Sequence, residues 1–192
     1  AVCLMSVFVC QMIYGYFIES RGRRQISNLF SYYVPPELVQ KMAENPGAFS
    51  MAPMQREMTV LFADVRGFTS IAEKLSPHDL ADLINAYLSA MSQVIREEHH
   101  GTLDKYIGDA IMAFWGAPVA DAAHAENAVL AALQMQQVAQ RLRGEFLTKG
   151  WPELRIGIGL NSGQMRVGDM GSNIRKAYTA MGDEVNLGAR LE

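Results

Sequence analysis

Residues 103–115 read LDKYIGDAIMAFW, and this stretch decides the fold expected for the chain. Two short segments, Leu103–Ile107 and Ala110–Trp115, flank the dipeptide Gly108-Asp109. A two-residue turn that starts with glycine is typical of a tight β-hairpin, because glycine adopts the backbone angles that such turns require. The stretch therefore predicts two antiparallel strands with a carboxylate in the turn between them.

An amphipathic helix is expected on each side of this hairpin. Before it, Ser76, Pro77 and Asp79 form a helix-start signal with a cap, a first-turn proline and an acidic third position. Apolar residues then recur at spacings of three and four, as on one face of a long helix. After the hairpin, a second helix is predicted over about residues 122–143, with Gly144 just past its end.

The outer parts of the domain supply the remaining strands. Met58–Val65 is a nearly continuous apolar run, as in a buried strand. In residues 154–160, apolar side chains alternate with arginine or glycine, which predicts a strand with one buried face. The sequence NSG at 161–163 is then expected to form a turn that leads into a partner strand around 165–168. The order strand, helix, hairpin, helix, strand predicts an α+β fold of the ferredoxin-like, palm-like kind, an antiparallel sheet with helices on one face.

The composition excludes several classes of protein. Of the 192 residues, 49% are hydrophobic and 19% are charged, and the formal net charge is −3. This apolar content can form a core, so a disordered or collagen-like chain is excluded. Without a basic excess to hold phosphate backbones, we expect no nucleic-acid partner.

The start of the chain has the properties of a membrane segment. Residues 1–18 carry no charge, and as a helix they would reach about 27 Å, close to the hydrocarbon thickness of a bilayer. The arginines at 21–24 follow this stretch, so the positive-inside rule places the rest of the chain in the cytoplasm. We therefore expect the end of a transmembrane helix at 1–18, in the inner (cytoplasmic) membrane, a connector at 19–56 and a cytoplasmic domain at 57–192. A buried core helix is the alternative for residues 1–18.

Two aspartates are expected at the same edge of the sheet. Asp64 ends the first strand, and Asp109 occupies the hairpin turn. Together they suit a hard divalent cation such as Mg²⁺, although either alone could be a strand cap or a turn former. The turn Gly67-Phe68-Thr69 follows directly and offers backbone amides to an anion. Carboxylates beside such a turn suit a metal-bound polyphosphate.

Four ordered blocks of the sequence resemble the class III nucleotidyl cyclases, the adenylyl and guanylyl cyclase family. The blocks are FADVRGFTS at 62–70, LDKYIGDAIMAFWGAP at 103–118, LRIGIGLNSG at 154–163 and YTAMGDEVNLGARLE at 178–192. The segment FSYYVPPELVQKMAENP, at 30–46, resembles bacterial members in which a sensor and a membrane region precede the cyclase. The resemblance implies that residues 57–192 form the catalytic domain.

The resemblance also implies roles for the matching residues. Asp64, Asp109 and the backbone carbonyl of Val65 match the ligands of two divalent cations, Mg²⁺ or Mn²⁺. Lys105 and Thr179 match the positions that read the base, where guanylyl cyclases typically have glutamate and a small residue such as cysteine. Lysine can donate to a ring nitrogen of adenine and threonine can accept from its amino group, which favours ATP as the substrate.

The implied reaction closes a ring within ATP. The ribose 3′-hydroxyl attacks the α-phosphorus, pyrophosphate leaves, and 3′,5′-cyclic AMP forms for signal transduction. Asn186 and Arg190 match the pair that positions the ribose and stabilises the transition state, and their spacing places them on one face of a helix. In the family each site lies between two catalytic domains, so a homodimer is the expected assembly.

Departures from the family and alternative functions are also visible in the sequence. The family's phosphate-binding lysine lies in a later strand, beyond Glu192, so we expect the catalytic domain to be incomplete at its C-terminus. Gln164 stands where some relatives have arginine. The alternatives are a catalytically silent nucleotide-binding signalling module and a guanylate cyclase. Residues 182–184, GDE, superficially resemble the GGDEF signature of diguanylate cyclases, but Met181 and Val185 replace its flanking glycine and phenylalanine.

Overall fold

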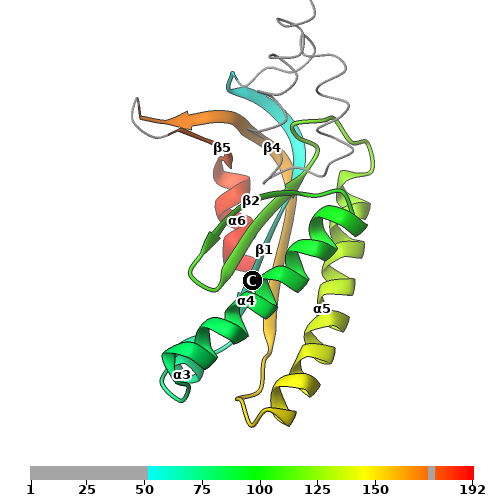
Figure 1. The fold of residues 1–192 in the computed structure, drawn as a ribbon. Helices are drawn as coiled ribbons and strands as arrows, with labels where there is room; N and C mark the ends of the chain where they lie inside the picture. Colours follow the sequence, from blue (N-terminus) through cyan, green and yellow to red (C-terminus); the bar gives the residue numbers. More distant parts are fainter. Residues whose placement is uncertain (1–51, 173–175) are drawn as a thin grey trace, which may run out of the picture. The chain divides into compact units, whose positions relative to one another are not determined.

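The computed structural model describes residues 52–172 and 176–192. Within these ranges, five strands form one antiparallel sheet in the order β2-β3-β1-β4-β5 (Figure 1). The strands are β1 (Met54–Val65), β2 (Thr102–Ile107), β3 (Ala110–Trp115), β4 (Ile156–Gly171) and β5 (Lys176–Met181). The first four strands have the order of a ferredoxin-like sheet, which confirms the predicted fold class.

The helices lie on both faces of this sheet. They are α3 (Phe68–Ala72), α4 (Pro77–Gln93) with its π-helical continuation η2 (Val94–Glu98), α5 (His124–Thr148) and α6 (Asp183–Leu191). The long helices α4 and α5 cover one face, as predicted, and run side by side in Figure 1. The short helix α6 packs against the opposite face of β1 and β4.

Strand β1 is the central strand of the sheet, and from Met58 onward both of its faces are buried. Leu61 and Val65 pack into the core beneath α4 and α5, whereas Val60 and Phe62 pack into the second core on the other face. Successive side chains of a strand point to opposite faces, so a strand between two cores needs apolar residues at nearly every position. This explains the continuous apolar run that identified β1 in the sequence.

The starts of the two long helices follow local signals, but the end of α5 does not. The Ser76 hydroxyl accepts a hydrogen bond from the Asp79 amide at 3.1 Å, so the predicted cap of α4 is confirmed. The predicted end of α5 at Gly144 is wrong, because the helix continues to Thr148. Its last turn is held by Phe146, which is buried and packs against the Trp151 ring with the centroids 5.3 Å apart.

The predicted turn at residues 161–163 is also wrong. These residues lie inside β4, which pairs with β1 without interruption from Val65↔Ile156 to Met54↔Val167. Within this ladder Ser162 lies opposite Thr59, and their hydroxyl oxygens are 2.7 Å apart. Because β1 is long enough to offer a partner to each of these residues, the strand continues through a sequence that is typical of turns.

The expected membrane segment at 1–18 and most of the expected connector lie outside the described residues. Strand β1 already begins at Met54, ahead of the domain boundary expected at residue 57. In the part of the chain that the structure describes, no helix is both long enough and apolar enough to cross a bilayer.

Candidate active site

The fold brings Asp64 and Asp109 together at one edge of the sheet. Strands β1 and β3 are antiparallel, so the end of β1 lies beside the turn that precedes β3. The Val65 amide donates a hydrogen bond to the Asp109 carboxylate at 3.3 Å. Burial and a hydrogen bond with the Asp64 carboxyl raise the pKa of Asp109 to about 6. Both carboxylates therefore lie at the edge of the sheet that the sequence predicts.

The chemistry of this pair fits a hard divalent cation. Two carboxylates that lie close together repel each other when both are ionised, and a cation between them removes that repulsion. The Glu192 carboxyl lies nearby, where burial and then the Asp64 charge raise its pKa. Among the described residues no cluster of three or more acidic, histidine or cysteine side chains could hold a metal alone. The backbone carbonyl of Val65, water and phosphate oxygens would complete the coordination of Mg²⁺ or Mn²⁺.

Tyr87 of α4 lies close enough to both carboxylates to feel their charges, and the sequence alone gives no sign of this. Its side chain is fully buried, and its hydroxyl has no hydrogen-bond partner among the described residues. Burial, followed by the charges of Asp64 and Asp109, raises the pKa of Tyr87 far above its usual range. The phenol therefore stays neutral, with its polar atom close to the carboxylate pair.

The turn after Asp64 lies where the sequence predicts it, and a short helix follows it directly. Gly67 has φ 68°, a left-handed conformation that favours glycine, and α3 begins at the next residue. Phe68 packs partly into the core, whereas Thr69 is exposed. The turn thus lies directly beyond the carboxylate edge of β1.

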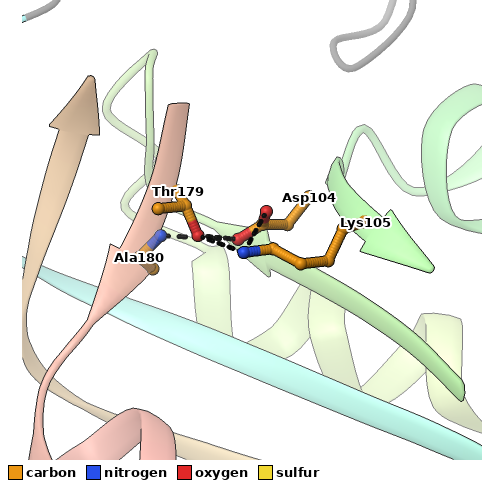
Figure 2. A network of polar contacts seen from close by, with 4 residues as sticks. All are labelled: Asp104, Lys105, Thr179 and Ala180. Carbon is orange, nitrogen blue, oxygen red and sulfur yellow. Dashed lines mark hydrogen bonds and ion pairs between the residues drawn. The ribbon is translucent and has the colours of Figure 1, made fainter. Parts of the chain in front are cut away.

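Lys105 and Thr179 are in direct contact, although they lie on the two edge strands of the sheet. The Lys105 ammonium group donates to the Thr179 hydroxyl oxygen at 3.0 Å. A dashed line marks this hydrogen bond in Figure 2. In the strand order, β2 and β5 are separated by three other strands, so the sheet must curl for its edges to meet here. The two positions that the family resemblance assigned to base recognition therefore form one unit.

Asp104 completes this unit, although it is not among the site residues predicted from the sequence. Its side chain is only 1% exposed. One carboxylate oxygen accepts hydrogen bonds from the Thr179 hydroxyl at 2.5 Å and the Ala180 amide at 3.4 Å, while the other lies 3.3 Å from the Lys105 ammonium group. A signal was available, since a carboxylate inside a buried part of a strand needs a hydrogen-bonding partner.

Asn186 and Arg190 lie on α6, and both are exposed. Between them, Gly188 lets the helix approach the sheet closely, because a Cβ atom there would lie 2.8 Å from a methyl group of Val60. The buried side of α6 therefore faces β1 and β4, and Asn186 and Arg190 face away from the core. Within one chain, the site residues form three groups: the carboxylate edge, the Asp104 network and this exposed face of α6.

The described part of the chain matches a known catalytic domain. The family model for the adenylate and guanylate cyclase catalytic domain matches residues 51–192. Adenylate cyclase 1 of Rhizobium meliloti is 38% identical over 163 residues, which are 85% of this chain and 24% of the relative. The adenylate cyclase of Anabaena cylindrica is 35% identical over 173 residues, which are 88% of this chain and 32% of the relative. The chain thus spans about a quarter to a third of these curated relatives.

Solved structures of both nucleotide specificities are similar to this chain. The adenylyl cyclase CyaB from P. aeruginosa superimposes with a TM-score of 0.70 at 38% identity, covering 73% of this chain and 72% of that one. The guanylyl cyclase Cya2 superimposes with a TM-score of 0.68 at 36% identity, covering 71% of this chain and 69% of that one. The chain belongs to the adenylate and guanylate cyclase catalytic domain family, the class III nucleotidyl cyclases.

Proposed function

We propose that this chain carries the catalytic domain of an adenylate cyclase, which converts ATP to 3′,5′-cyclic AMP and pyrophosphate in signal transduction. Because adenylyl and guanylyl cyclases share this fold, the fold does not select the base. The observation that carries the proposal is the contact between Lys105 and Thr179. The named adenylate cyclases at 38% and 35% identity support the same substrate.

Adenine and guanine present opposite patterns to such a pair. Adenine carries an amino group beside a ring nitrogen with a lone pair, whereas guanine carries a carbonyl beside a ring N–H. Lys105 has donors and no acceptor, so it suits the ring nitrogen of adenine. The Thr179 oxygen can accept from the amino group, and a guanine base would leave these partners mismatched.

Asp64, Asp109 and the carbonyl of Val65 would hold two divalent cations at the carboxylate edge. When bound, such cations lower the pKa of the ribose 3′-hydroxyl and neutralise charge on the triphosphate. The backbone amides of the turn at residues 67–69 would bind phosphate oxygens beside them. No separate side-chain base is required by this arrangement.

Asn186 and Arg190 would act from the exposed face of α6. Asn186 would hydrogen-bond and orient the ribose, so that the 3′-hydroxyl oxygen lines up with the α-phosphorus. As that oxygen loses its proton to solvent and bonds to phosphorus, the bond from phosphorus to the bridging oxygen breaks and pyrophosphate leaves. Arg190 would donate to the charge that develops on the transferring phosphoryl group.

We further propose that the catalytic domain works as a homodimer. Two copies facing each other would combine the carboxylate edge of one with the base-reading and α6 residues of the other, giving two equivalent sites. Apolar side chains around the latter residues are exposed in the single chain and would be covered in a dimer. They are Tyr106, Ile107, Met181, Leu187 and Leu191.

We also propose that residues 1–18 anchor the protein in the inner (cytoplasmic) membrane, with residues 19–56 as a connector and the catalytic domain in the cytoplasm. The support is the charge-free apolar sequence and the arginines that follow it.

Product identification tests the proposed activity. The full-length protein is incubated with Mn²⁺ and either ATP or GTP, and the nucleotide products are separated and identified. Cyclic AMP as the main product supports the proposal, and Asp109→Ala serves as the inactive control. Cyclic GMP as the main product would make the protein a guanylate cyclase. Nucleotide binding without any cyclic product would make it a silent signalling module.

A further inference from the structure

The buried carboxylate of Asp104 touches both side chains of the base-reading pair. It lies on β2, next to Lys105 in sequence, and reaches Thr179 on β5 across the curled sheet (Figure 2). No phosphate or cation site among the described residues requires an acid at this position. Asp104 therefore acts through its contacts with Lys105 and Thr179.

These contacts determine which hydrogen-bonding groups of the Thr179 hydroxyl are used within the protein. A hydroxyl group has one hydrogen to donate and two lone pairs that accept. The Asp104 oxygen at 2.5 Å takes the hydrogen, because an ionised carboxylate can only accept. The Lys105 ammonium group at 3.0 Å occupies one lone pair. One lone pair is left, and no hydrogen.

The polar contacts of Asp104 favour its ionised form, in which both carboxylate oxygens accept. The oxygen that faces Thr179 also receives the Ala180 amide, and the second oxygen faces the Lys105 ammonium group. Both oxygens thus face donors, and neither contact favours a proton on the carboxyl. Burial raises the pKa of Asp104 above its usual value, and the hydrogen bonds from Thr179 and Lys105 offset only part of that rise.

We propose that Asp104 is a positioning residue that determines base specificity. By taking the only hydrogen of the Thr179 hydroxyl, it restricts Thr179 to accepting, and so selects a purine with an amino group at position 6 over one with a carbonyl. The inference rests on the proposed function, since it concerns the same base-reading site. Without Asp104, the Thr179 hydroxyl could rotate and donate to a carbonyl.

Inosine triphosphate is the sharpest probe, because it replaces the 6-amino group and bare ring nitrogen of ATP with a carbonyl and a ring N–H. We compare kcat/KM for ATP with kcat/KM for inosine triphosphate in the full-length protein and in Asp104→Leu, which has a similar volume and no acceptor. We expect this ratio to fall at least about tenfold in Asp104→Leu. In the wild type the Thr179 hydroxyl only accepts, which favours the 6-amino group of ATP, whereas in the variant it can also donate to the carbonyl of inosine triphosphate. An unchanged ratio in a folded Asp104→Leu protein would overturn the proposal.

Two further variants separate this effect from a general loss of structure. In Asp104→Asn, the Ala180 amide orients the side-chain oxygen toward Thr179, so the acceptor is retained and the ratio should stay within about threefold of the wild type. Thr102→Val removes another buried hydroxyl of β2, which donates to the Ala117 carbonyl at 2.7 Å, and should leave the ratio unchanged. If Asp104→Asn or Thr102→Val lost selectivity as fully as Asp104→Leu, hydroxyl polarity would not be the cause.

Binding distinguishes a failure of this inference from a failure of the proposed function. The same variants are titrated with ATP and inosine triphosphate in a thermal-shift assay, which needs no turnover. A wild-type protein that makes no cyclic product, but prefers ATP in this assay and loses the preference in Asp104→Leu, would refute the cyclase activity and support the role of Asp104. If the wild type and Asp104→Leu showed the same preference for ATP over inosine triphosphate, the proposed role of Asp104 would be refuted.

Discussion

The hydroxyl of Tyr87 is buried in the core without a hydrogen-bond partner among the described residues. A buried, unsatisfied hydroxyl costs about 1–3 kcal/mol of folding free energy. Tyr87→Phe removes only this oxygen, so we expect the free energy of unfolding to rise by about 1 kcal/mol in urea denaturation. The control is Tyr106→Phe, which loses an exposed hydrogen bond of 2.7 Å to Ser92 and should give no gain. A loss of stability in Tyr87→Phe would show that the hydroxyl is satisfied in solution.

Asp109 connects metal binding to stability. In the metal-free protein its carboxyl lies against that of Asp64, and Asp109→Asn removes the repulsion between the two charges. The change should therefore stabilise the fold, but by no more than about 1 kcal/mol, because solvent screens much of this repulsion. The same change should abolish the rise in melting temperature that Mn²⁺ produces in the wild type. Cyclic AMP formation should fall at least about a hundredfold with the loss of a metal ligand. An Asp109→Asn protein that Mn²⁺ still stabilises would place the cation elsewhere.

The site was predictable from the sequence where it depends on local structure. Asp64 and Asp109 could be placed together because one ends a strand and the other fills a tight turn. The contact between Lys105 and Thr179 could not, because it forms only when the edges of a five-stranded sheet curl together. Asp104 was missed because the β2–β3 register shifts between Leu103 and Lys105, so a simple alternation does not place its side chain.

Helix α5 contains a glycine in its interior, where the sequence predicted a helix end. A Cβ atom added at Gly144 meets no other atom within 4 Å. Gly144→Ala should therefore raise the free energy of unfolding by about 0.5–1 kcal/mol, because alanine loses less backbone entropy in a helix. Gly150 has equally open surroundings but φ +74°, so Gly150→Ala should destabilise the protein. Equal effects of the two changes in urea denaturation would contradict this account.

The predictions that rest on strong local signals were correct, whereas the predictions for segments whose structure depends on a distant partner were wrong. The hairpin β2–β3 and the start of α4 follow from turn and cap residues within a few positions. The predicted turn at residues 161–163 failed because β1 supplies hydrogen-bond partners along the full length of β4. The end of α5 depends on Phe146 and its contact with Trp151, which the helical pattern alone does not reveal.

At the scale of the whole molecule, the proposed dimer predicts complementation between inactive proteins. Asp64→Ala would lack the carboxylate edge, and Arg190→Ala would lack the α6 group. In a mixed dimer one site carries both defects and the other carries none, so each hybrid should recover one active site. A mixture of equal amounts should regain up to about a quarter of wild-type cyclic AMP production, because half of the dimers are hybrids with one of two sites. No recovery in the mixture would argue against a shared site.

The central position of β1 also has a consequence for synthesis of the chain. Its ladder partners in β3 and β4 lie at residues 111–115 and 156–167, so its pairing is long-range on both sides. At about 5–20 residues per second, a ribosome needs roughly 5–18 s after completing β1 to reach the first residue of β4. During that interval a strand that is apolar on both faces has no finished sheet to join, which makes the nascent chain a target for chaperones and slows its folding.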